Sequence, residues 1–169
     1  MRKESRKKLR TDIRILVIKI VLIVPVMLIM YFVFFGIFRV NDSSMTPGID
    51  EGDLVISYRL DKHYSANDLT VYDYKDVFQV RRVVAVQGDT VDISEDGLVI
   101  NGHLQIEPDI YQETYAYEEG ISFPVTLQEG EVFLLADARE NATDSRAYGP
   151  ALVDYTEGVV IAAIRHGGL

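Results

Sequence analysis

The 169-residue sequence predicts a mainly β protein with one N-terminal transmembrane helix. The stretch Ile20–Phe38 is apolar and carries no charge, and the chain after it alternates β-branched runs with glycine-containing turns. After residue 40, the sequence has no amphipathic helical pattern of convincing length. We therefore expect a basic cytoplasmic tail over residues 1–14, a transmembrane anchor over residues 15–38 and an extracytoplasmic β domain over residues 39–169.

The N-terminal part has the length and charge of a membrane anchor. Its 19 uncharged residues extend about 28 Å as a helix, close to the thickness of a bilayer core. A cleaved signal peptide is the alternative, but its apolar region spans about 7–15 residues and ends in an A-x-A-like site, which is not found before Arg39. Residues 1–39 carry nine basic and two acidic side chains. The positive-inside rule thus predicts a single-pass protein of the cell membrane, with a cytoplasmic N-terminus and an extracellular C-terminal domain.

The β domain is predicted from short runs rich in valine and isoleucine. Turn chemistry separates the runs: Gly97 follows two acidic residues, as in a β-hairpin, and Asn101-Gly102 is the next turn. Residues 107–122 are acidic and rich in tyrosine, and we expect a solvated surface excursion there, with a partner-docking surface as the alternative. The expected strands cover residues 53–57, 69–74, 77–86, 90–94, 98–100, 131–136 and 158–164.

Charge and composition exclude several functions. Residues 40–169 carry a net charge of −16, which argues against nucleic-acid binding because lysine and arginine supply most of that affinity. The chain has no cysteine, so disulfides, thiolate catalysis and zinc ribbons are excluded. His63, His103 and His166 are scattered outside the candidate motifs. We therefore expect no Ser-His-Asp triad, no metal site and no cofactor.

Three segments, residues 41–53, 79–89 and 136–149, carry the candidate chemistry. In this order behind a single anchor, they resemble the type I signal peptidases, the membrane-bound Ser/Lys proteases of family S26 that remove secretory signal peptides. The third segment is the most specific, because it matches the family pattern Gly-Asp-Asn-Arg-x-x-Ser-x-Asp-Ser-Arg-x-x-Gly at six positions. The resemblance implies a signal-peptidase-like β domain. The matching residues are Asp137, Arg139, Asp144, Ser145, Arg146 and Gly149.

The resemblance places Ser44 in the position of the nucleophile and Arg81 in the position of the general-base lysine. A serine hydroxyl needs a neighbouring base to become a good nucleophile. The pKa of arginine lies far above neutral pH, and arginine is not deprotonated in proteins. The β domain contains only two lysines, Lys62 and Lys75, and neither lies at a position in the sequence where it can replace the base. The sequence therefore predicts that Ser44 lacks an activating base.

Other positions also depart from the family pattern. Ala142 stands where the family has a serine that orients the lysine, and Ala138 replaces an asparagine. Asp42 lies at the oxyanion site, where we expect its carboxylate to repel a developing oxyanion. The motif residues and Arg82 are expected to form a structural network of salt bridges. By resemblance, the walls of a peptide-binding groove include Asp42, Ser43, Met45, Phe78, Gln79 and Val80.

Two functions remain open. The first is a non-catalytic pseudoenzyme, similar to the degraded signal-peptidase-like proteins of Gram-positive pilus loci, that aids pilus assembly by binding a pilin precursor or a sortase. The second is an active type I signal peptidase that cleaves secretory or pilin signal peptides with Ser44. Both functions place the protein in the lipid bilayer, and the second has signal-peptide-bearing preproteins as its substrates.

Overall fold

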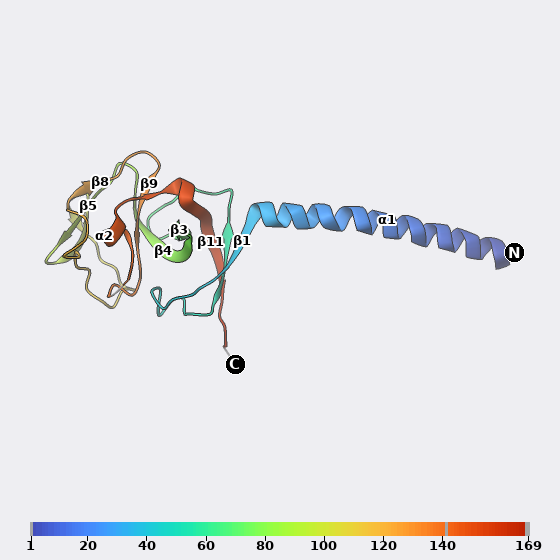
Figure 1. Cartoon of the computed structure of the whole chain (residues 1–169), viewed down its shortest axis with the longest axis horizontal. Helices are drawn as coiled ribbons and strands as arrows, with labels where there is room; N and C mark the ends of the chain where they lie inside the picture. Colours follow the sequence, from blue (N-terminus) through green and yellow to red (C-terminus); the bar gives the residue numbers. More distant parts are fainter. Residues whose placement is uncertain (1, 141, 168–169) are drawn as a thin grey trace. The chain divides into compact units, whose positions relative to one another are not determined.

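The structure is a computed structural model that describes residues 2–140 and 142–167. It contains two compact units, Met1–Phe35 and Gly36–Leu169. The first unit is formed by helix α1, Arg2–Phe34 (Figure 1). Within α1, Asp12–Phe34 is long and apolar enough to cross a membrane, with a mean hydropathy of 2.8. The predicted apolar helix is therefore present, but it ends four residues before the expected boundary at residue 38.

The residues after α1 form a strand, although residues 35–38 were expected to belong to the anchor. Strand β1, Phe35–Arg39, is the edge strand of a seven-stranded sheet and neighbours β2, Leu54–Tyr58. Its first four residues carry no charge, like the end of the helix before it, so hydropathy alone does not mark the change of structure. Hydrogen bonding to β2 is a tertiary interaction that decides the boundary.

The second unit is mainly β, as predicted. Its larger sheet has the order β1-β2-β11-β3-β4-β9-β10, and its smaller sheet has the order β7-β6-β5-β8. Figure 1 shows β5 and β8 at the opposite end of this unit from β1. Within the described residues, the only helices after α1 are the four-residue α2, Ser145–Tyr148, and the 3₁₀ turn η1, Val153–Tyr155. The remaining strands are β3 Leu69–Tyr74, β4 Val77–Val86, β5 Thr90–Ser94, β6 Gly97–Ile100, β7 His103–Leu104, β8 Val125–Thr126, β9 Glu131–Leu135, β10 Ala151–Leu152 and β11 Thr156–Ile164.

Strand β4 joins the two halves of the larger sheet and positions the site. It pairs with β3 from Val77 to Arg82, and with β9 only from Arg82 onward. In the described part of the chain, no strand pairs with the second edge of β4 before Arg82. The first half of β4 thus leaves one edge open beside the loop that follows β1.

Three clusters of buried side chains hold this unit together. One cluster lies under β4, β5, β6 and β9 and includes the fully buried Val91 and Phe133. A second cluster packs Met45 and Ile49, from the loop after β1, against Val80 of β4. The side chain of Met45 is fully buried. Because burying a methionine side chain stabilises a fold by about 1.5–3 kcal/mol, Met45 fixes the neighbouring Ser44 relative to β4.

Candidate active site

Ser44 lies in a turn-rich loop, one residue before the buried Met45. The backbone oxygen of Ser44 accepts a hydrogen bond of 2.8 Å from the amide of Ala138. This bond ties the loop to the third of the three candidate segments, residues 136–149, which we call the third motif. The Ser44 hydroxyl donates to Asp42 Oδ1 at 2.5 Å, and the Ser44 amide donates to the same oxygen at 3.1 Å. The position of the Ser44 side chain is therefore set by Asp42.

Arg81 completes the site from β4. Its Nη1 donates to Ser44 Oγ at 2.7 Å and to the Val80 carbonyl at 2.6 Å. Its Nε and Nη2 both donate to the Thr143 carbonyl, at 3.1 and 2.9 Å. The Arg81 side chain is only 1% exposed, and its Nη2 lies 3.7 Å from Asp42 Oδ2. The buried guanidinium is thus held by two backbone carbonyls, a hydroxyl and a carboxylate.

This geometry defines what Ser44 can do. The guanidinium can donate to Ser44 Oγ but cannot accept its proton, because arginine stays charged in proteins. The proton points instead to Asp42, whose side chain is 46% exposed. Asp42 was expected at the oxyanion site as a repelling charge, but in the structure its carboxylate accepts the hydrogen bond of the Ser44 hydroxyl. Within the described residues, Asp42 is the one group in contact with Ser44 that can accept a proton.

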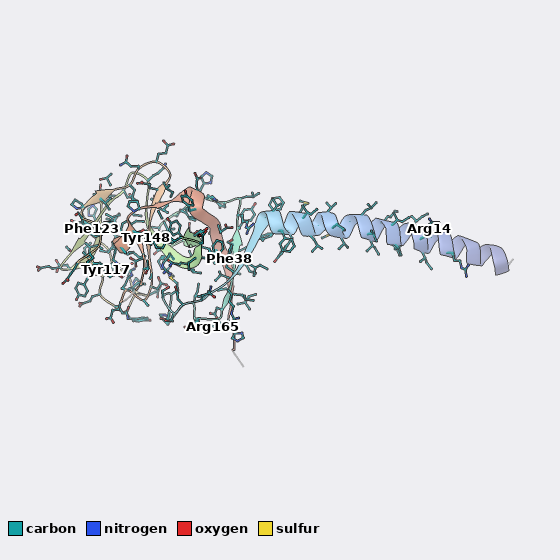
Figure 2. The ribbon with its side chains drawn as sticks, viewed as in Figure 1. Arg14, Phe38, Tyr117, Phe123, Tyr148 and Arg165 are labelled. Atoms are coloured by element: carbon teal, nitrogen blue, oxygen red, sulfur yellow. The ribbon has the colours of Figure 1, made fainter. Side chains whose placement is uncertain are left out.

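The nearby Tyr148 does not provide a second base. Tyr148 belongs to α2 within the β unit (Figure 2) and interacts electrostatically with Arg81. Burial raises the pKa of its hydroxyl well above the ordinary value of tyrosine, more than the nearby Arg81 charge lowers it. Tyr148 is therefore protonated at neutral pH and has no tendency to accept a proton from Ser44.

Residues of the third motif form one buried and one partly buried ion pair. Arg82 pairs with Asp137 at 2.6 Å, and these hydrogen bonds raise the pKa of Arg82. Arg146 pairs with Asp144 at 2.8 Å, and both side chains are buried. Asp144 also caps α2, since its side chain accepts from the amide of Arg146. The Ser145 hydroxyl accepts from the amide of Leu134 in β9. These contacts fasten the loop after β9 to the sheet.

Arg139 pairs with a residue that the sequence analysis did not select. Its Nη2 lies 2.6 Å from Glu107 Oε1, and its Nη1 donates to the hydroxyl of the buried Thr114. Tyr117, labelled in Figure 2, donates to the Ala142 carbonyl at 2.7 Å, and the guanidinium of Arg146 lies over its ring. Residues 107–122 form no helix or strand, as expected, yet these contacts anchor them to the third motif. The acidic and aromatic composition of residues 107–122 was the one feature of the sequence that could have indicated these contacts with the arginines of the third motif.

The groups around Ser44 line a cavity of about 390 Å³. Residues from all three candidate segments line it, and they include Gln79, which was expected in the groove. Met45 and Val80 lie in the buried core instead, and Phe78 packs its ring against Phe38 at a centroid distance of 5.0 Å. The cavity is lined by Asp42, Ser43, Ser44, Gln79, Arg81, Ala138, Glu140, Ala142 and Thr143.

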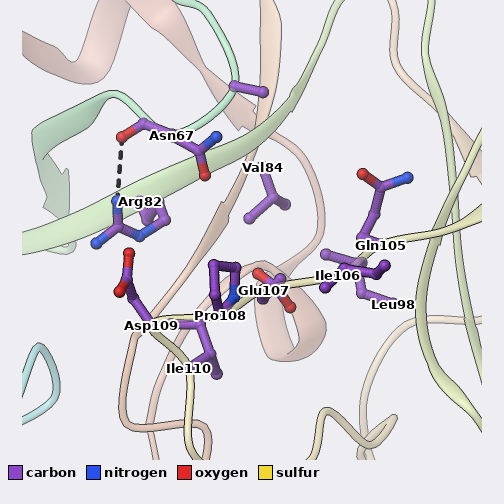
Figure 3. A pocket seen from close by; sticks show the side chains of 11 residues that line it. Asn67, Arg82, Val84, Leu98, Gln105, Ile106, Glu107, Pro108, Asp109 and Ile110 are labelled. Atoms are coloured by element: carbon purple, nitrogen blue, oxygen red, sulfur yellow. Dashed lines mark hydrogen bonds between the residues drawn. The ribbon is translucent and has the colours of Figure 1, made fainter.

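A second cavity of about 380 Å³ lies beside Arg82 (Figure 3). Arg82 donates there to the Asn67 carbonyl at 3.1 Å, and Ile106 on the rim is 90% exposed. Neither Ser44 nor Arg81 lines this cavity. Among the described residues, no group of three or more histidine, aspartate or glutamate side chains is arranged to hold a metal ion.

The chain is similar in sequence to a known protein family. A family model described as signal peptidase, peptidase S26, matches residues 13–164. Signal peptidase I from Bacillus licheniformis is 30% identical over 146 residues, which cover 80% of this chain and 77% of that protein. Signal peptidase I S from Bacillus subtilis is 28% identical, covering 75% of this chain and 74% of its own length. A solved signal peptidase I from Enterococcus faecalis V583 is 24% identical, with a TM-score of 0.47, and covers 59% of this chain and 97% of that chain.

Proposed function

The chain belongs to the signal peptidase family, peptidase S26, and from this premise we propose that it binds signal-peptide-bearing precursors at a membrane without cleaving them efficiently. The observation that carries the proposal is the Arg81 guanidinium, which donates to Ser44 Oγ at 2.7 Å from the position of the general base. A permanently protonated group in that position cannot activate the hydroxyl. The cavity beside Ser44 and the open edge of β4 nevertheless leave room for an extended peptide.

The proposal extends to a partner and an orientation. A pseudoenzyme of this kind holds a pilin precursor, or the sortase that polymerises it, during pilus assembly. Helix α1 anchors the protein, with the basic residues at its start in the cytoplasm and the β unit outside. The support for this role is the combination of a family fold with an arginine that removes the base but leaves the cavity.

The proposal is tested with the full chain in lipid nanodiscs and labelled pilin and secretory precursors. We expect wild-type protein to bind a precursor and leave it intact, and we expect the Ser44→Ala variant to bind equally well. Ser122→Ala, at an exposed serine outside the cavity, is the matched control. Cleavage by wild type that is lost in Ser44→Ala but kept in the control would refute a purely binding role.

The hydrogen bond between Ser44 and Asp42 favours a second candidate, a slow signal peptidase in which Asp42 is the base. In this reaction, the proton of Ser44 Oγ passes to Asp42 Oδ1 and Oγ attacks the scissile carbonyl; the proton then passes to the leaving amine, and water hydrolyses the acyl-enzyme. The Arg81 guanidinium stabilises the negative charge that develops on Oγ. If this candidate is right, wild type cleaves a precursor slowly, and Asp42→Asn loses that cleavage as fully as Ser44→Ala while retaining precursor binding.

A further inference from the structure

We infer that Tyr111 is a specificity-determining residue beside the cavity around Ser44, and that the bound peptide packs an aromatic or other large apolar side chain against its ring. The inference rests on the proposed binding function. It adds the chemical class of one ligand side chain, which lies in a separate pocket next to that cavity.

The pocket adjoins the cavity around Ser44 and has a volume of about 250 Å³. Ala138 lines both hollows, and its amide donates to the Ser44 carbonyl at 2.8 Å. The residue shared by the two hollows thus has a side chain of a single methyl group and contacts the Ser44 backbone directly. A peptide bound beside Ser44 can therefore extend a side chain into the pocket. The residues that line the pocket are Thr46, Pro47, Tyr111, Gln112, Asp137 and Ala138.

The polar side chains of the pocket are already hydrogen-bonded within the protein. Both carboxylate oxygens of Asp137 accept from Arg82, at 2.7 and 2.6 Å. The Thr46 hydroxyl donates to a backbone carbonyl of its own loop at 3.0 Å, and the carboxamide oxygen of Gln112 accepts from a backbone amide at 3.1 Å. Asp137 is the one charged residue that lines the pocket, and it is paired. A charged ligand side chain would lose water in this pocket without gaining an unpaired opposite charge.

Tyr111 offers the ligand an accessible aromatic ring. It is 81% exposed, so a ligand can reach it without any rearrangement of the protein. Glu107 and Thr114, on either side of Tyr111 in the chain, both bind the buried Arg139. The segment that carries the ring is therefore anchored at two points. Tyrosine supplies a large contact area at a low cost in conformational entropy, and its ring packs well against aromatic and aliphatic groups.

The size of the pocket fits one side chain of a longer ligand. Pockets that hold whole small molecules have volumes of about 300–1,000 Å³, and this pocket is smaller. The expected effect is a preference for a large apolar side chain over a small one at a single position of the peptide. We expect a phenylalanine peptide to bind about threefold to tenfold more tightly than an alanine peptide at the position that faces Tyr111.

The test uses the full chain in nanodiscs and a bound precursor peptide in which each position is changed in turn to alanine, phenylalanine or lysine. Dissociation constants are measured for wild type, for Tyr111→Ser and for Tyr111→Phe, and thermal unfolding shows that each variant is folded. Serine removes the ring, and phenylalanine keeps it. Tyr155→Ser is the matched control, since Tyr155 is exposed and lines neither the pocket nor the cavity around Ser44.

The inference predicts one position where wild type, Tyr111→Phe and Tyr155→Ser prefer phenylalanine over alanine, and where Tyr111→Ser does not. Equal affinities for the phenylalanine and alanine peptides at every position in wild type would overturn the inference and leave the proposed function intact. Phenylalanine preferences that all persist in Tyr111→Ser would overturn it too, as would tighter binding of lysine than of phenylalanine at the position that depends on Tyr111. A wild-type chain that binds no precursor at all would overturn the proposed function, and the inference with it.

Discussion

Replacing Arg81 by lysine should restore useful peptidase activity only when Asp42 is replaced as well. The structure gives the reason: the Arg81 guanidinium lies 3.7 Å from the Asp42 carboxylate, and a lysine ammonium in the same place would have that carboxylate nearby. A base must be neutral before it can accept the proton of Ser44. Burial favours neutral lysine, whereas a carboxylate within about 4–6 Å favours the charged form.

The magnitude follows from the two opposing effects. A nearby carboxylate raises the pKa of a lysine by about 1–3. We take the low end, because the Asp42 side chain is 46% exposed and solvent screens its charge. Each increase of one in pKa lowers the neutral fraction about tenfold while the charged form predominates. The double variant Asp42→Ser with Arg81→Lys should therefore cleave a precursor at least about ten times faster than Arg81→Lys alone.

The assay follows cleavage of a precursor by the full chain in detergent micelles, with thermal unfolding of each variant measured in parallel. Adding Ser44→Ala to the double variant should abolish the cleavage, which identifies the nucleophile. Equal rates for the single and double variants, with both proteins folded, would show that the Asp42 carboxylate does not control the group at position 81. Cleavage that survives Ser44→Ala would contradict the assignment of the whole site.

Three further predictions concern stability and follow from individual contacts. Arg139→Met should reduce the free energy of unfolding, measured by chemical denaturation, by about 3–5 kcal/mol, because Glu107 loses its ion-pair partner. The control is Arg165→Met, at an exposed residue, which should change the free energy of unfolding by less than about 0.5 kcal/mol. Gly158→Ala should destabilise the protein more than Gly88→Ala. Both glycines have a positive φ, but only at Gly158 would the new Cβ lie 2.0 Å from a backbone oxygen. Equal melting temperatures for the two variants would contradict this prediction. Hydrogen bonds from backbone amides, chiefly that of Asp50, lower the pKa of Asp53. The Asp53 carboxylate therefore stabilises the fold at neutral pH, and this contribution is lost as the pH falls below the ordinary carboxyl range. The difference in unfolding free energy between wild type and Asp53→Asn should shrink below about pH 4.

Most of the β unit could be predicted from the sequence because its strands are short, β-branched and separated by turn residues. The expected strands at residues 69–74, 77–86 and 90–94 coincide with β3, β4 and β5. Strands of two residues, such as β8 and β10, carry too little periodic signal to be recognised. The start of β1 was assigned to the anchor, because an apolar strand and the end of an apolar helix have the same composition.

The ion pairs show the same limit at the level of side chains. Arg82 and Asp137, both of which the sequence analysis selected, are partners in the structure. Arg139 was selected too, but its partner Glu107 belongs to a segment without regular structure, 32 residues earlier in the chain. No local pattern links two such residues, because their contact depends on how the segment folds back onto the third motif.

The sequence alone determined that position 81 holds a side chain unable to accept a proton, because the basicity of a guanidinium is a property of the residue and not of its surroundings. Only the tertiary structure decided that the Ser44 hydroxyl donates to Asp42 and that the Arg81 guanidinium reaches Ser44. The contact between Arg81 and Ser44 depends on how the loop after β1 packs against β4, which brings together two side chains that lie 37 residues apart in the chain.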